Sequence, residues 1–133
     1  MKKFLFLLLI GGALFVTSCT KQYNSVQPNQ TFISDPIDPT TWTTADGGKN
    51  YQVNIDMTNK LTNYVNSNDA VIIALTFDGG NQYEQIPEVY NNVSYTYTYS
   101  KGIITVFAQS ADGTQVIVAP PTFEAKIVLV DSQ

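Results

Sequence analysis

The chain has 133 residues, with 7 basic and 11 acidic side chains, a formal net charge of −4, one cysteine and no histidine. Because histidine is absent and only one thiol is present, the composition excludes Ser–His and Cys–His nucleophile pairs and the usual zinc ligand sets. All the basic side chains are lysines and the carboxylates outnumber them, so the chain lacks the positive charge with which proteins bind nucleic acid.

The first nineteen residues have the layout of a secretory signal. Lys2 and Lys3 precede an apolar run over residues 4–16, and small residues lead from this run to Cys19. The run is shorter than the roughly 20 apolar residues that a membrane-spanning helix needs. The pattern therefore predicts a signal peptide that is removed from the mature protein.

The end of this pattern resembles the lipobox of bacterial lipoproteins, in which a cysteine follows small residues at the end of the apolar run. The resemblance implies cleavage after residues 1–18 and acylation of Cys19 on its sulfur and its new N-terminus. Several acyl chains attach a protein stably to a membrane, so the implied location is the outer membrane, with a lipid anchor as the contact. The mature chain keeps five lysines against eleven carboxylates, which argues against docking on anionic lipid through a basic patch.

Residues 19–40 are expected to form the acylated cysteine and a flexible tether. They are rich in Gln, Asn, Ser, Thr and Pro, and their few apolar residues follow no period, a composition that buries too little surface to offset its ordering entropy. A short strand around Phe32 and Ile33 is the alternative. In lipoproteins of Bacteroides-like bacteria an acidic cluster soon after the cysteine is associated with surface display. Residues 20–24 contain no acid, so this resemblance favours a position facing the periplasm.

From Thr41 onward the apolar residues recur with a period of two, the mark of half-buried strands. Gly-containing turn sequences such as Asp-Gly-Gly, Lys-Gly and Asp-Gly separate the apolar stretches, since glycine reaches the positive φ values of tight turns at little cost. The pattern predicts strands over residues 41–45, 51–57, 70–77, 83–86, 93–99, 103–108, 115–119 and 123–130. The segment over 70–77 is nearly all apolar, as expected of a central strand.

Seven or eight short strands without a convincing helix predict an all-β fold for residues 41–133, an antiparallel β-sandwich of immunoglobulin-like type. The layout runs from the strand with Trp42, through the break at Pro87, to Pro120-Pro121 and the last strand. It resembles the small lipoproteins of unknown function that are common in Bacteroides-type bacteria. The resemblance implies fold and membrane location, and it names no activity.

A row of tyrosines is the first candidate site. Tyr95, Tyr97 and Tyr99 fall on one face of the strand predicted over residues 93–99, and they could stack on sugar rings if they lie in solvent. Same-face aromatics on a strand are more often buried against the opposite sheet, and this is the interpretation we favour, also for Trp42. The exposure of these rings discriminates between the two.

A second candidate surrounds the turn after the apolar strand. Asp78, Asn81 and Glu84 offer carboxylate and amide oxygens, the ligands that calcium prefers, but no D-x-D-x-D run is present. A turn that uses Asp and Asn for its own backbone explains the residues equally well. Paired carboxylates for glycoside hydrolysis are the only enzymatic chemistry left, and nothing in the sequence selects a pair.

We therefore expect a lipid-anchored envelope lipoprotein without enzymatic activity or cofactor. Its expected role is that of an interaction or structural accessory module that contacts another envelope protein. The alternative is a small-ligand module that binds a glycan with an aromatic face.

Overall fold

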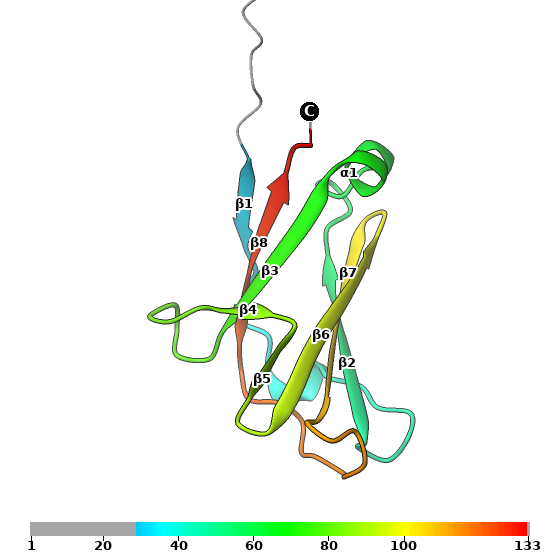
Figure 1. Ribbon diagram of the computed structural model, residues 1–133, viewed down its shortest axis with the longest axis vertical. Helices are drawn as coiled ribbons and strands as arrows, with labels where there is room; N and C mark the ends of the chain where they lie inside the picture. Colours follow the sequence, from blue (N-terminus) through cyan, green and yellow to red (C-terminus); the bar gives the residue numbers. More distant parts are fainter. Residues whose placement is uncertain (1–28, 133) are drawn as a thin grey trace, which may run out of the picture.

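The computed structural model describes residues 29–132, which form two packed antiparallel sheets of four strands each (Figure 1). The first sheet consists, in spatial order, of β1 (Gln30–Ile33), β8 (Glu124–Val130), β3 (Ala70–Thr76) and β4 (Glu84–Ile86). The second consists of β2 (Asn50–Asp56), β7 (Ile103–Ser110), β6 (Val93–Ser100) and β5 (Glu88–Tyr90). The prediction of an all-β, sandwich-like fold is confirmed. The predicted signal peptide and Cys19 lie outside the described residues.

The core lies between the two sheets because each strand turns alternate residues inward. In β7, Ile104, Val106 and Ala108 are fully buried while the residues between them are half-buried. In β3, Val71, Ile73 and Leu75 are buried. Ile72 is 37% exposed, so β3 is covered on one face rather than on both.

The sandwich begins earlier than the sequence predicted. Strand β1 pairs with β8 over all four of its residues, and an isolated bridge between Ile37 and Phe123 continues the contact. The 3-10 helix η1 (Pro39–Thr41) follows. The prediction of a tether over the whole of residues 19–40 is therefore wrong for residues 30–40, and the alternative of a short strand there is confirmed. The physical reason is pairing with β8, a partner almost a hundred residues away that local composition does not reveal.

The hairpins follow from their turn residues. β6 and β7 pair from Val93–Ser110 to Ser100–Ile103, and Gly102 at φ +78° supplies the turn. β5 and β6 are joined by Asn91 and Asn92, both at positive φ, as a two-residue hairpin of type I′ requires. The chain changes sheets between β4 and β5, at the cis peptide bond before Pro87.

Two predicted strands are absent from the described part of the chain. Residues 41–45 contribute only an isolated bridge between Thr43 and Gln52. Residues 115–119 form no strand. Their one hydrogen bond to another backbone group in the described part of the chain runs from the N–H of Ile117 to the carbonyl oxygen of Gly48. A short helix, α1 (Asn63–Asn68), begins after Thr62, whose side chain accepts a hydrogen bond from the N–H of Val65.

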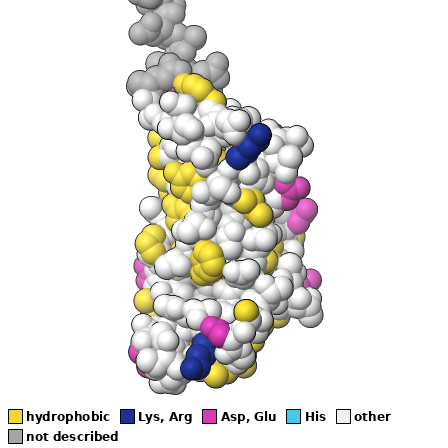
Figure 2. Space-filling model, turned by 90° about the vertical axis from the view of Figure 1, so that its right-hand side faces the viewer, with side chains coloured by type: hydrophobic (Ala, Val, Ile, Leu, Met, Phe, Trp, Pro, Cys, Tyr) yellow, Lys and Arg dark blue, Asp and Glu magenta, His cyan; other side chains and the backbone are white. Residues whose placement is uncertain are grey.

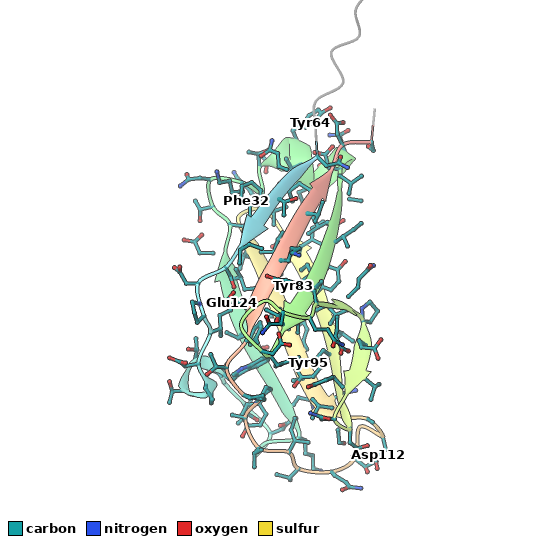
Figure 3. All side chains as sticks on the ribbon, turned by 90° about the vertical axis from the view of Figure 1, so that its left-hand side faces the viewer. Phe32, Tyr64, Tyr83, Tyr95, Asp112 and Glu124 are labelled. Atoms are coloured by element: carbon teal, nitrogen blue, oxygen red, sulfur yellow. The ribbon has the colours of Figure 1, made fainter. Side chains whose placement is uncertain are left out.

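The sandwich has two distinct ends (Figure 1). The start of β1, the C-terminus and α1 lie at one end. The segment that follows β7, drawn in orange, crosses the opposite end. In the side view of Figure 3, Tyr64 of α1 lies near the first end and Asp112 at the other. Within residues 29–132, no helix is long and apolar enough to cross a membrane.

Candidate functional site

The tyrosine row on β6 faces the opposite sheet, and its exposure rises along the strand. Tyr95 is 2% exposed and packs against Phe77 with ring centroids 5.4 Å apart. Tyr97 is half-buried, and Tyr99, at 37% exposed, lies at the open end of the row. The three rings therefore do not lie side by side in solvent, which is what stacking on a sugar requires.

Burial changes the chemistry of these phenols. Desolvation of the ring raises the pKa of Tyr95 to about 12, and the nearby Tyr90 adds to the shift. Desolvation, with a contribution from Tyr99, also raises the pKa of Tyr97. The hydroxyl of Tyr97 donates a hydrogen bond of 2.6 Å to the carbonyl oxygen of Val71 on the other sheet. The hydroxyl of Tyr97 thus joins the two sheets, whereas Tyr95 contributes through the packing of its ring.

Trp42 is part of the core. Its side chain is 6% exposed, and its ring lies 5.5 Å from that of Phe123, tilted by 43°. The indole Nε1 has no hydrogen-bond partner among the described residues. The ring lies against other core side chains and offers no exposed face for a ligand.

The carboxylate of Asp78 accepts hydrogen bonds from the backbone of its own turn. Oδ1 of Asp78 accepts hydrogen bonds from the Thr76 hydroxyl at 2.7 Å and from the N–H groups of Asn81 and Gln82 at 3.0 Å each. These bonds lower the pKa of Asp78, the one from Gln82 most. The carboxylate of Glu84 accepts a hydrogen bond from the side chain of Gln82 at 3.0 Å. Among residues 29–132 there is no group of three or more acidic, cysteine or histidine side chains that could hold a metal.

The same turn occurs a second time in the chain. The sequence Thr-x-Asp-Gly-Gly starts at Thr44 and again at Thr76. In both copies the threonine hydroxyl donates to the aspartate and accepts the N–H of the second glycine, at 3.0 Å. The second glycines, Gly48 and Gly80, have φ of +93° and +92°. The sequence analysis did not identify this repeated motif, although the identity of four of its five residues is a signal that could have found it.

Exposed hydrophobic side chains mark the end of the sandwich opposite the start of β1. Val116 is 63% exposed and Val118 is 85% exposed, the highest value among the large hydrophobic residues described. Beside them lies a mostly apolar hollow of about 330 Å³, lined chiefly by Tyr90, Val93, Ile117 and Pro120. No charged side chain lines this hollow. Such an apolar surface is a feature of contact sites.

A second hollow lies on the outer face of the sheet β2-β7-β6-β5. Phe107 points to this face because its neighbours in β7 point inward, and it pairs across the sheet with Gln52 and Thr96. The hollow of about 450 Å³ is bounded by Phe107 together with hydroxyl and amide side chains such as Thr43 and Asn50. From the side of this sheet, most of the surface is uncharged and polar, with scattered yellow hydrophobic side chains (Figure 2).

Comparison with known proteins found no matching family model, curated protein or solved structure. The candidate sites therefore rest on the geometry of the chain itself.

Proposed function

We propose that this protein is a lipid-anchored envelope protein without enzymatic activity, which binds a protein partner in the envelope with the end of its sandwich opposite the start of β1. The surface consists of Val116, Val118 and the adjoining apolar hollow, and is called the distal surface below. We also propose that the sandwich is of immunoglobulin-like type, as its strand spacing predicted.

The exposure of two valines in one short segment is the observation that carries this proposal. Leaving Val116 and Val118 in water forgoes roughly 1.5–3 kcal/mol per side chain relative to full burial. A partner that covers them together with the hollow recovers part of this free energy. The hollow is uncharged and apolar, so the proposed partner surface is apolar too.

The anchor supports the same orientation. Cys19 precedes β1 by eleven residues, and a chain of that length spans at most about 40 Å. Acylation at Cys19 would keep the β1 end toward the outer membrane and leave the distal surface facing away, on the periplasmic side. Cys19→Ala should abolish labelling by a palmitate analogue and membrane retention. Labelling that survives in this variant would contradict the anchor.

Site-specific photo-cross-linking in cells tests the distal surface. A photoreactive amino acid in place of Val118 should give discrete higher-mass adducts. The control replaces Thr98, an exposed residue on the outer face of β6, and should give none. Equal adducts from both positions, or none from position 118, would count against the distal surface.

A glycan-binding role is the second candidate, now at the Phe107 hollow rather than at the tyrosines. An aromatic ring surrounded by amides and hydroxyls suits a sugar, because the ring contacts its C–H face while the polar groups bond its hydroxyls. A ligand at 100 times its dissociation constant stabilises a protein by about 2.7 kcal/mol. A panel of oligosaccharides should then raise the melting temperature of the wild type and not that of Phe107→Ala.

A further inference from the structure

We propose that a second copy of this chain pairs with residues 115–119 as an antiparallel β-strand, so that two copies associate through their distal surfaces. This inference rests on the proposed function, because it names the occupant of the same surface. It is supported by a difference between the sequence pattern and the structure of this segment.

Residues 115–119 have the sequence of a strand but lack a strand partner. Val116, Ile117 and Val118 are β-branched residues that favour sheets, and the exposed valines flank a half-buried Ile117, as in a strand with one covered face. Within residues 29–132, the backbone N–H groups of Val116 and Val118 donate no hydrogen bond. The segment thus presents a row of free donors and acceptors, which is the template for strand addition.

The backbone hydrogen bond between Ile117 and Gly48 indicates which edge of the segment lacks hydrogen-bond partners. The N–H of Ile117 donates to the carbonyl of Gly48 at 2.9 Å. Because successive residues of an extended chain direct their backbone groups to opposite edges, this bond places those of Val116 and Val118 on the edge away from Gly48. An incoming strand bonds to these two residues.

The segment is complementary to itself across that edge. In an antiparallel pair centred on Ile117, Val116 of each copy faces Val118 of the other as a hydrogen-bonded pair. The two Ile117 residues then face each other across the two-fold axis without hydrogen bonds between them. This is consistent with the structure, in which the N–H of Ile117 points the other way and donates to Gly48. No charged side chain occurs in residues 113–123, so the symmetric contact required of a dimer brings no like charges together. This self-complementarity favours a second copy over a different protein.

Cysteine cross-linking of the full chain tests the register. The pairing puts Gln115 of one copy opposite Ala119 of the other, at about 5 Å between Cβ atoms. The two Gln115 residues are about 13 Å apart, beyond the reach of a disulfide. Tagged Gln115→Cys and Ala119→Cys chains, co-expressed and oxidised in envelopes, should form at least tenfold more disulfide dimer than either variant alone. The wild type, with Cys19 only, is the control. No dimer, or equal dimer in single and mixed pools, would overturn the proposal.

A backbone variant provides a second measurement. Val118→Pro removes the N–H that would bond across the axis, whereas Val118→Thr keeps it and stays β-branched. Sedimentation of the full chain in detergent should show self-association weakened at least tenfold by proline and little changed by threonine, in variants with matching melting curves. Equal association of both would also overturn the proposal.

The two proposals fail in different ways. If position 118 cross-links only to a different polypeptide and no disulfide dimer forms, the distal surface is retained as a binding site and the second copy is rejected as its occupant. Absence of both adducts and dimers would reject both proposals. Self-adducts together with register-specific dimers would support both.

Discussion

The hydroxyl of Tyr97 on β6 lies 2.6 Å from the carbonyl oxygen of Val71 on β3 and joins the two sheets of the sandwich. Val71 is buried, and Tyr97 is half-buried at the position where the core opens toward solvent. Because a backbone carbonyl in a desolvated position needs a partner, the tyrosine contributes through its hydroxyl as well as through its ring.

Tyr97→Phe should therefore destabilise the domain while leaving its shape unchanged. Loss of one such hydrogen bond costs about 1 kcal/mol, which corresponds to a melting temperature lower by roughly 4–8 °C in a domain of this size. Thermal unfolding measures the effect. Tyr99→Phe is the matched control, since no hydrogen bond links its hydroxyl to the described residues. Equal melting of the two variants would contradict a structural role for the Tyr97 hydroxyl.

Tyr95 should make the fold sensitive to alkaline pH. Its burial raises the pKa to about 12 from an ordinary value of 10.0, so the folded chain keeps the phenol proton more tightly than the unfolded chain does. The resulting stabilisation is fully present below pH 10 and is lost as the pH rises toward 12. Chemical denaturation of Tyr95→Phe should show a smaller loss of stability between pH 9 and 12 than the wild type. Parallel pH curves would contradict this prediction.

The sequence predicted the parts of the fold that depend on local pattern. The alternation of Val or Tyr with Ser or Thr over residues 93–99 and the Lys-Gly turn identified the β6–β7 hairpin, since a period of two and a glycine at positive φ leave few other structures. The favoured interpretation of Tyr95 as a core residue rests on the same alternation. The exposure of each tyrosine in the row depends on where the opposite sheet ends. Sequence periodicity carries no information on that position.

The errors arose where long-range pairing overrides local pattern. β1 was assigned to the tether because only its pairing with β8 orders it. Residues 115–119 were predicted as a strand because their composition favours one, but no neighbouring strand faces them. The exposed Val118 was missed for the same reason, as it looks like a core residue until its partner is found to be absent from the described part of the chain.

Gly48 should be more sensitive to substitution than Gly47, although both have positive φ. A Cβ at Gly48 would lie 3.1 Å from Cγ1 of Val116 and 3.2 Å from the carbonyl oxygen of Ile117, whereas one at Gly47 meets nothing within 4 Å. Gly47→Ala should cost about 1–2 kcal/mol for its left-handed backbone. Gly48→Ala adds steric conflict and should lower the melting temperature further, and it should also displace the distal surface. Similar melting temperatures of the two variants would show that residues 116–117 can move away from the added Cβ without loss of stability.

Deleting part of β1 should destabilise the sandwich, whereas an equal deletion nearer Cys19 should not. Removing residues 30–34 takes away the pairing with β8 and the half-buried ring of Phe32, above which the ammonium of Lys60 lies 4.8 Å from the ring centroid. We expect a loss of at least ~2 kcal/mol from the buried surface and the ladder hydrogen bonds. Removing residues 20–24 of the same chain is the control, and thermal unfolding compares the two. If both deletions melted like the full chain, β1 would contribute nothing to stability and the domain would begin after residue 40, as the composition alone indicated.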